Sequence, residues 1–256
     1  MRVLVIGGCG TVGRMVLPIL ADRHRLIVLD LRAPAEPLPG VEYHVGDARD
    51  IELTKRLAAG ADSVLYMAMG PVDGWDTPPT VRTHLEVAVS GVYLALRAAH
   101  EAGVRHAIYT SSMSVFRYLI PGTERAATRH EIGRFPDDDT PPDARDFYGL
   151  AKRLGEEVCR SAAVEWDLDV VCLRLSFPIP DHQWPPVDPL FHRLIATSGS
   201  DCAARTGGGA GVPRARFEAF AISGDVSGRT MSLAKTRQRL GWSPAHAAPG
   251  PKPAQP

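Results

Sequence analysis

Several features that mark particular classes of protein are scarce or absent in this sequence. The sequence has 29 basic residues (lysine and arginine) and 29 acidic residues (aspartate and glutamate). This balanced charge gives no reason to expect nucleic acid or an anionic membrane as a partner. No apolar run approaches the roughly 20 residues that a membrane-spanning helix requires. A strand is expected directly at the amino terminus, without a preceding signal peptide. The four cysteines include no C-x-x-C pair, which is atypical of zinc sites and disulfide frameworks: Cys9, Cys159, Cys172 and Cys202. We therefore expect a cytoplasmic protein with reduced thiols and no metal site.

Short apolar runs rich in β-branched residues alternate with helical patterns, which is typical of a parallel sheet covered by helices on both faces. Strands are predicted at 2–6, 26–30, 42–45, 63–68, 107–112, 169–175 and 217–223. Helices are predicted at 13–22, 51–60, 83–103, 147–166, 191–196 and 232–240. The strands do not alternate strictly between polar and apolar residues, as expected when both faces of a parallel sheet are buried. The fold class is therefore predicted to be α/β, a doubly wound parallel sheet of the Rossmann type.

The pattern divides the chain into three parts. Residues 1–180 are predicted to form the nucleotide-binding domain, residues 181–244 a small carboxyl-terminal substrate-binding lobe, and the Ala/Pro-rich residues 245–256 a disordered tail. The polar, Pro-rich run from Phe116 to Asp143 is interpreted as a surface loop, including the acidic residues 137–139. A helix that begins near Ser200 is expected to be interrupted by the glycine run at 207–211, which disfavours helix.

A glycine-rich turn follows the first predicted strand. Gly7, Gly10 and Gly13 lie between that strand and a helix, where glycine permits a sharp turn and a close backbone approach to a pyrophosphate. The helix N-terminus then offers free N–H groups to the phosphates. Asp30, at the end of the second strand, is placed to accept the ribose hydroxyls of NAD. Its charge would repel a 2′-phosphate and so favours NAD over NADP, although Arg14 and Arg32 weaken that preference.

A second group of residues has the chemistry of proton transfer. Tyr148 and Lys152 are four residues apart on a predicted helix and therefore share one face. An ammonium beside a phenol favours the phenolate, which makes Tyr148 a candidate acid/base. Ser112 ends the fifth predicted strand, at the sheet edge where ligands bind, and its hydroxyl could orient the substrate oxygen. The predicted catalytic residues are therefore Ser112, Tyr148 and Lys152.

Together these motifs resemble the extended short-chain dehydrogenase/reductase family, in its NAD-dependent epimerase/dehydratase branch. The resemblance implies hydride transfer between nicotinamide and a substrate carbon, with Asp47 and Ala48 beside the adenine and Pro178 near the carboxamide. The cofactor contacts expected from the turn and the resemblance are Gly7, Gly10, Thr11, Val12, Gly13, Asp30, Leu31, Arg32, Asp47, Ala48, Ala68, Met69, Gly70, Tyr148, Lys152 and Pro178. The substrate contacts expected are Ser111, Met113, Arg174 and Phe177.

The sequence departs from this family in ways that bear on the substrate. Ala88 occupies a position where the family usually has asparagine, and Phe177 precedes Pro178 where nucleotide-sugar enzymes commonly carry another asparagine. Phe177 and the short carboxyl-terminal part favour a free sugar or sugar acid, as in the similar, short uronate dehydrogenases. A nucleotide-sugar epimerase or dehydratase that recycles NAD is the alternative, and a non-catalytic dinucleotide-binding regulator is a second.

Two further expectations concern partners and loops. The long helices at 83–103 and 147–166 are rather apolar for surface elements, and in the family they pair with their copies in a second subunit, so a homodimer is expected. Trp75, His182 and Trp184 lie in loops expected to surround the substrate opening. They could line a sugar pocket or simply pack the loops.

Overall fold

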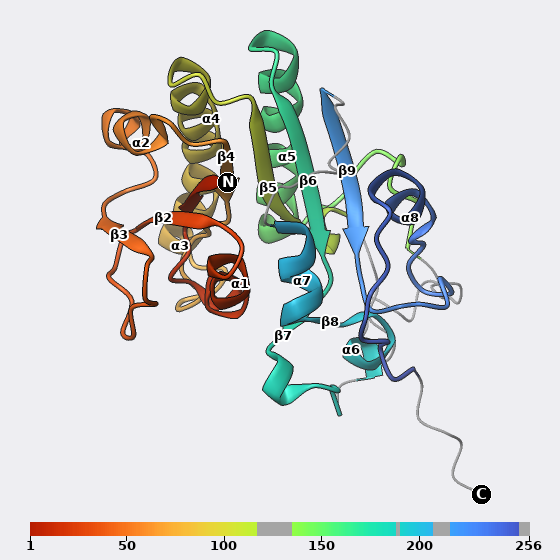
Figure 1. Ribbon diagram of the computed structural model, residues 1–256. Helices are drawn as coiled ribbons and strands as arrows, with labels where there is room; N and C mark the ends of the chain where they lie inside the picture. Colours follow the sequence, from red (N-terminus) through yellow and green to blue (C-terminus); the bar gives the residue numbers. More distant parts are fainter. Residues whose placement is uncertain (117–134, 188–189, 207–215, 251–256) are drawn as a thin grey trace, which may run out of the picture.

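A seven-stranded, all-parallel sheet forms the centre of the protein. The computed structural model describes residues 1–116, 135–187, 190–206 and 216–250. The strand order is β3-β2-β1-β4-β5-β6-β9, so the order reverses between β1 and β4 (Figure 1). The strands are β1 (Arg2–Ile6), β2 (Arg25–Asp30), β3 (Glu42–Val45), β4 (Ser63–Tyr66), β5 (His106–Ser112), β6 (Asp169–Leu175) and β9 (Phe217–Ile222). The doubly wound Rossmann-type sheet predicted from the sequence is confirmed, and its crevice lies where β1 and β4 end.

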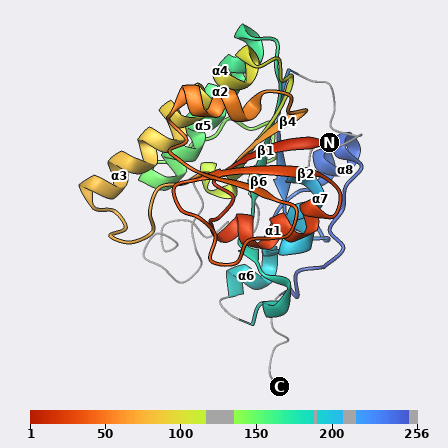
Figure 2. The same ribbon diagram turned by 60° about the vertical axis from the view of Figure 1, so that its left-hand side comes forward.

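Helices cover both faces of the sheet. The helices are α1 (Thr11–Ala21), α2 (Ile51–Ala58), α3 (Pro78–Leu85), α4 (Val92–Glu101), α5 (Phe147–Glu165), α6 (Leu190–Ile195), α7 (Gly199–Thr206) and α8 (Ala234–Leu240). One buried apolar cluster joins the sheet to α1, α7 and α8, and a second joins it to α2, α4 and α5. The two helical layers lie on opposite sides of the strands (Figure 2).

The helix predicted at 83–103 runs without a break from Pro78 to Glu101, but it is not α-helical throughout. Its middle forms a π-helical turn, Glu86–Gly91, between α3 and α4. The buried Tyr66 hydroxyl donates to the Val87 carbonyl oxygen at 2.7 Å, and a Cβ on Gly91 would meet that same hydroxyl group. Tyr66 of β4 thus donates a hydrogen bond to a backbone carbonyl oxygen of the π-helical turn. Ala88, which replaces the family's asparagine, lies inside this π turn.

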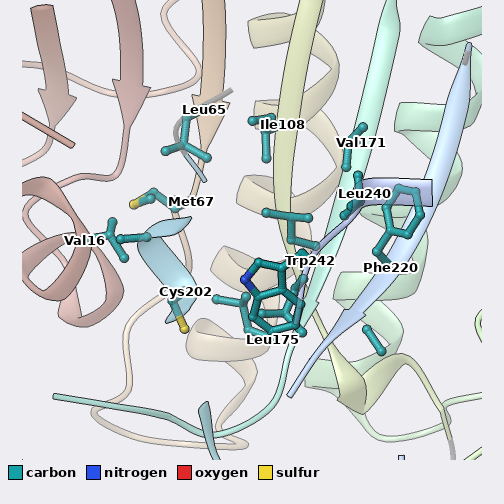
Figure 3. Packing of buried hydrophobic residues seen from close by; sticks show 14 of the residues in the cluster. Val16, Leu65, Met67, Ile108, Val171, Leu175, Cys202, Phe220, Leu240 and Trp242 are labelled. Carbon is teal, nitrogen blue, oxygen red and sulfur yellow. The ribbon is translucent and has the colours of Figure 1, made fainter. Parts of the chain in front are cut away.

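The carboxyl-terminal part adds a strand to the main sheet and apolar side chains to its core. Residues 217–222 return to the main sheet as β9, paired along β6 from Val170 with Phe217 to Leu175 with Ile222. In Figure 3, Cys202 on α7 and Trp242 after α8 lie with Val16 of α1 and Met67 over one face of the sheet. The apolar side chains of β9, α7 and α8 thus complete this core, and the division at residue 181 stays a prediction. Only the short β7 (Pro178–Ile179) and β8 (Thr197–Ser198) form a small sheet of their own.

The first residues of the predicted disordered tail are held in place. The Asp201 carboxylate accepts the backbone N–H groups of Ala245 at 2.7 Å and His246 at 2.9 Å. The Ala248 N–H donates to the Gly224 carbonyl oxygen at 2.7 Å. Residues 245, 246 and 248 thus have hydrogen-bond partners in the folded part of the chain, and the disordered tail stays a prediction. The rest of the predicted tail, most of the predicted loop at 116–143, and the glycine run at 207–211 lie outside the described residues.

Candidate active site

The glycine turn is closely packed at the point where the strand order reverses. Gly7, directly after β1, has a φ of +84°, and a Cβ there would overlap the backbone of Ala68 at the end of β4. A Cβ on Gly13 would overlap the carbonyl of Gly8 across the turn. Position 7 therefore requires glycine because of its left-handed backbone conformation. Position 13 requires glycine because a Cβ has no space there. The turn brings the ends of β1 and β4 together, as a dinucleotide crevice requires.

The first helix presents its N-terminus at this turn. The N-cap residue of α1 is Gly10. Among the described residues, no side chain caps the helix, and its first turn contains no acidic residue. Thr11 and Val12 are the first two helical residues. The free N–H groups and the positive end of the helix dipole favour an anion here. The arrangement fits the pyrophosphate of a dinucleotide.

The Asp30 carboxylate links this turn to the end of β2. It accepts the N–H of Cys9 at 2.8 Å and that of Arg32 at 3.3 Å. Burial, and secondarily the charge of Asp30, raise the pKa of the Cys9 thiol to about 11, so it is a neutral thiol at physiological pH. The side chains of Leu31 and Arg32 are exposed. Asp30 is thus held at the sheet edge where the sequence placed the ribose site.

The remaining predicted cofactor residues occupy the neighbouring strand ends. After β3, Asp47 is bound by the guanidinium of Arg49, which lowers the pKa of its carboxyl, and Ala48 is buried. After β4, Met69 is exposed, and Gly70 packs so closely against the His84 ring that a Cβ would overlap it. Pro178 begins β7 and pairs with Thr197 of β8.

The first turn of α5 brings the predicted acid/base towards the end of β5. The Asp146 carboxylate caps α5 by accepting the Gly149 N–H at 2.9 Å. A Cβ on Gly149 would overlap the carbonyl oxygen of Ser114, so the helix approaches the segment after β5 closely. Ser112 ends β5, and its hydroxyl accepts the Ser114 N–H at 3.1 Å. Tyr148 and Ser112 therefore lie on two segments in direct contact.

Lys152 lies one turn further along α5 and is buried. Its ammonium donates to the Thr110 carbonyl oxygen at 2.7 Å. Burial lowers the pKa of Lys152 to about 8, so it is largely protonated at neutral pH. A buried ammonium on the same helix face as Tyr148 has the charge needed to favour a phenolate. The three predicted catalytic residues thus share one end of β5 and α5.

Aromatic side chains surround Tyr148. Its ring centroid lies 5.6 Å from that of Trp75 and 6.0 Å from that of His84. Phe147 joins the group at 4.7 Å from Trp75 and 5.3 Å from His84. His84 is buried, its Nε2 lies 3.0 Å from the Pro71 carbonyl oxygen, and burial lowers its pKa. His84 is thus a packing histidine, and it packs beside the candidate acid/base.

Two predicted substrate residues have other partners. The Ser111 hydroxyl donates to Glu156 at 2.7 Å, and Arg174 donates to both carboxylate oxygens of Glu156 at 2.9 and 2.7 Å. Arg174 also donates to the carbonyl oxygen of Asp138 at 2.8 Å. All four residues are buried, so Ser111 and Arg174 lie in an internal network rather than at an open pocket. Asp138 also differs from the solvated loop residue expected, because its carboxylate accepts the Ala221 N–H of β9 at 3.0 Å.

The other two predicted substrate residues also pack against the core. Met113 is buried within the apolar cluster under α1 and α7. Phe177 packs on the edge of that cluster, with its ring centroid 4.1 Å from that of His192. Its φ of +40° is a left-handed conformation that is rare for a residue with a bulky side chain. Among the residues that the structure describes, no group of three His, Cys, Asp or Glu side chains is placed to hold a metal ion, and no helix is long and apolar enough to cross a membrane.

Comparisons with known proteins agree with this arrangement. Residues 3–186 match the model of the NAD dependent epimerase/dehydratase family. The L-arabinose 1-dehydrogenase (NAD(P)(+)) of Haloferax volcanii is 25% identical over 254 residues, which cover 95% of this chain and 96% of that protein. N-acetyl-alpha-D-glucosaminyl-diphospho-ditrans,octacis-undecaprenol 4-epimerase of Escherichia coli is 30% identical over 165 residues, but the match spans only 64% of this chain and 43% of that protein.

A solved structure shows the same fold over nearly the whole chain. The uronate dehydrogenase of Agrobacterium tumefaciens superposes with a TM-score of 0.76 at 19% identity, covering 96% of this chain and 85% of that one. At this identity the likeness establishes the fold. The correspondence extends over the carboxyl-terminal segments as well as over the strands that form the site.

Proposed function

This chain belongs to the NAD-dependent epimerase/dehydratase family of enzymes, and on that premise we propose that it oxidises a small free sugar, or reduces the corresponding carbonyl compound. The observation that carries the proposal is the contact between the first turn of α5 and the segment after β5. There Gly149 packs on the Ser114 carbonyl and brings Tyr148 towards Ser112. A phenol, a hydroxyl and a buried ammonium at one sheet edge are a proton-transfer set. A protein that only bound the dinucleotide would have no use for them.

The dinucleotide site has the parts that NAD requires. The glycine turn and the uncapped N-terminus of α1 would hold the pyrophosphate, and Asp30 would accept the ribose hydroxyls. Asp47, Ala48 and the strand-end residues 68–70 would flank the rest of the cofactor. NAD, when bound, accepts a hydride from the substrate carbon or, in reduced form, donates one. Because Asp30 is an anion at the ribose position, we propose that NAD is preferred over NADP.

The protein side of the reaction is a proton transfer. In the oxidative direction, the Tyr148 phenolate accepts the proton of the substrate hydroxyl while Ser112 donates a hydrogen bond to the same oxygen. The charge of Lys152 stabilises the phenolate before transfer. In the reductive direction, the phenol returns the proton to the developing alkoxide. Each role follows from a group with the required charge or donor at one end of the sheet.

The free-sugar substrate is favoured by two observations. Phe177 stands where nucleotide-sugar enzymes of this family commonly carry an asparagine, and its ring packs against His192. The chain also matches a sugar dehydrogenase over 96% of that protein's length, whereas it spans less than half of the diphospho-sugar epimerase.

The quaternary structure is proposed to be a homodimer formed through α4 and α5. These helices contact each other on one face of the sheet and expose Tyr93, Leu154 and Val164. Exposed apolar side chains on two adjacent helices suit burial against a second copy. Light scattering coupled to gel filtration should give twice the monomer mass. Leu154→Glu combined with Val164→Glu should give the monomer, and a wild-type monomer would contradict the proposal.

The decisive experiment measures NADH formation with a panel of free aldoses and uronic acids. Wild-type protein should produce NADH with at least one of them, and Tyr148→Phe should reduce kcat by about 10²- to 10⁴-fold, the usual contribution of a positioned acid/base. The variant should still bind NADH, because the phosphate site is untouched. Turnover of a nucleotide sugar without net NADH formation, with cofactor retained through purification, would support the epimerase/dehydratase alternative instead.

A further inference from the structure

A large apolar side chain is left half exposed beside the candidate acid/base. Trp75 keeps 49% of its surface accessible although its ring touches three aromatic neighbours. It lies in the segment after β4, which also exposes Met69 and Val72. A ligand that covered this indole would remove apolar area from water and gain binding free energy. The position, 5.6 Å from the Tyr148 ring, makes a bound substrate the natural cover.

The turn that carries Trp75 is rigidly built. Its two neighbours, Gly74 and Asp76, both have left-handed backbone conformations, with φ of +65° and +64°. The Thr77 hydroxyl donates to the Gly74 carbonyl oxygen at 2.7 Å, and the Thr80 hydroxyl donates to the Asp73 carbonyl oxygen at 3.1 Å. These bonds fasten the turn to the start of α3. Aspartate adopts this left-handed conformation more readily than most residues other than glycine, so Asp76 suits the turn.

Trp75 contacts the candidate acid/base Tyr148 and is separated from the end of the predicted cofactor segment by His84. The segment that would run along the cofactor ends at Gly70, which packs directly on the His84 ring. His84 in turn contacts both Trp75 and Tyr148, so it stands between the end of the cofactor segment and the indole. The order along this wall is therefore Gly70, His84, Trp75. The half-exposed indole thus lies next to the phenol of Tyr148.

The chemistry of this wall selects an uncharged ligand surface. Among the described residues, the side chains in ring contact with Trp75 are Phe147, Tyr148 and His84, and burial keeps His84 neutral by lowering its pKa. Arg174, which the sequence suggested as a substrate contact, is bound to Glu156 in the interior. An aromatic face attracts the C–H-rich face of a sugar ring, whose carbon-bound hydrogens carry partial positive charge.

We propose that Trp75 is a specificity-determining residue that packs against the apolar face of an uncharged cyclic sugar whose reacting hydroxyl is held at Tyr148. The inference rests on the proposed function and deepens it by naming the substrate class as neutral aldoses rather than uronic acids. Trp75 contributes contact to the substrate and none to the proton transfer. Its loss should therefore weaken substrate binding while leaving the chemistry and the cofactor site intact.

The experiment compares wild-type protein with Trp75→Ala and Trp75→Phe on paired neutral aldoses and uronic acids. Trp166→Phe is the matched control, because it changes another tryptophan in ring contacts at the far end of α5, roughly 27 Å along the helix from Tyr148. Trp75→Ala should raise KM for the preferred aldose at least about tenfold with kcat nearly unchanged. Trp75→Phe should restore most of the loss. NADH affinity should be the same in every variant.

A second measurement keeps this inference separate from the proposed reaction. Melting temperature is recorded for the NADH-bound proteins with each sugar, which needs no turnover. Stabilisation of wild type by neutral aldoses, reduced in Trp75→Ala and retained in Trp166→Phe, supports the role of Trp75 even if no NADH is formed and the proposed oxidation fails. Equal KM and equal stabilisation in wild type and Trp75→Ala would overturn it. So would a preference for uronic acids, stabilisation by no sugar, or an equal fall in kcat and NADH affinity.

Discussion

Arg174 binds both carboxylate oxygens of Glu156 in the interior of the protein, Nε to Oε1 at 2.9 Å and Nη2 to Oε2 at 2.7 Å. Glu156 lies one turn beyond Lys152 on α5, and Arg174 lies on β6. The pair joins the helix that carries Tyr148 to the sheet, and Ser111 extends the bond to β5. It therefore fixes α5 against β5 and β6.

Removing one partner of this pair should be costly. Glu156→Leu leaves a buried guanidinium without its main counter-charge, so the free energy of unfolding should fall by about 3–5 kcal/mol. Arg239→Ala is the control, because it breaks a pair with Glu218 in which the arginine is exposed, and it should cost less than about 1 kcal/mol. Urea denaturation measures both. If both variants lose the same free energy of unfolding, the buried Arg174–Glu156 pair stabilises the protein no more than the exposed pair does.

Asp138 should make stability depend on pH. Burial raises its pKa to about 6 from an ordinary 3.8, despite the opposing charges of Arg174 and Lys235. The folded protein therefore holds this proton more tightly than the unfolded chain, and ionisation between pH 4 and 6 destabilises the fold. Asp138→Asn removes that penalty. The free energy of unfolding of Asp138→Asn minus that of wild type should therefore increase by about 3 kcal/mol from pH 4 to pH 8. A difference that stays constant across this range would contradict the buried charge.

Lys152 should make the free energy of unfolding depend on pH in a higher range than Asp138 does. Its folded-state pKa of about 8 lies below the ordinary 10.5, so the cost of burying the ammonium is fully present below pH 8 and is relieved as pH rises towards 10.5. Wild type should therefore gain about 2–3 kcal/mol of stability relative to Lys152→Met between pH 8 and 10. Thermal or urea unfolding at several pH values tests this. If the two proteins respond to pH in parallel, Lys152 is not desolvated as described.

The glycine turn should tolerate no side chain. Gly13→Ala would place a Cβ on the Gly8 carbonyl, and Gly7→Ala would also force a left-handed alanine against Ala68. Both should weaken NADH binding, measured by nucleotide fluorescence, by at least about 100-fold. Such a loss corresponds to about 3 kcal/mol. Gly40→Ala is the control, because Gly40 also has positive φ, at +76°, but open space around its Cβ position. It should leave NADH affinity unchanged, and similar losses in all three would rule out the packing argument.

The cofactor preference should depend on Asp30. Asp30→Ala removes the anion that would repel a 2′-phosphate, and the ratio of NADH to NADPH affinity should shift towards NADPH by about tenfold or more, a change of about 1.4 kcal/mol. The variant also loses the acceptor for the Cys9 N–H, so affinity for NADH itself should fall. Arg25→Ala, at the opposite end of β2, serves as the control for the ratio. Unchanged selectivity in Asp30→Ala would count against the ribose assignment.

Some of the site could be predicted from sequence because its signals are local. The turn at Gly7–Gly13 needs its glycines within a few residues of one another, and Tyr148 and Lys152 share a face because a helix repeats every 3.6 residues. The strands followed from short apolar runs, and β6 was predicted with the bounds it has. The amino-acid sequence by itself thus determined the Rossmann-type sheet, and it placed the glycine turn and the pair Tyr148 and Lys152 for which we propose roles in cofactor binding and proton transfer.

Other features depended on contacts between distant residues, and only the tertiary structure decided them. Ser111 and Arg174 sit at a strand edge that predicts substrate contact, but they lie 45 and 18 residues from Glu156 in sequence, and only packing brings the three together. Residues 217–222 read equally well as a strand of a separate lobe or of the main sheet, until their pairing with β6 made them β9. Trp75 was ambiguous between loop packing and pocket lining because exposure and neighbours are properties of the fold. A periodic pattern specifies an element and its buried face, whereas burial of a charge or an aromatic ring is decided by which non-local partner satisfies it.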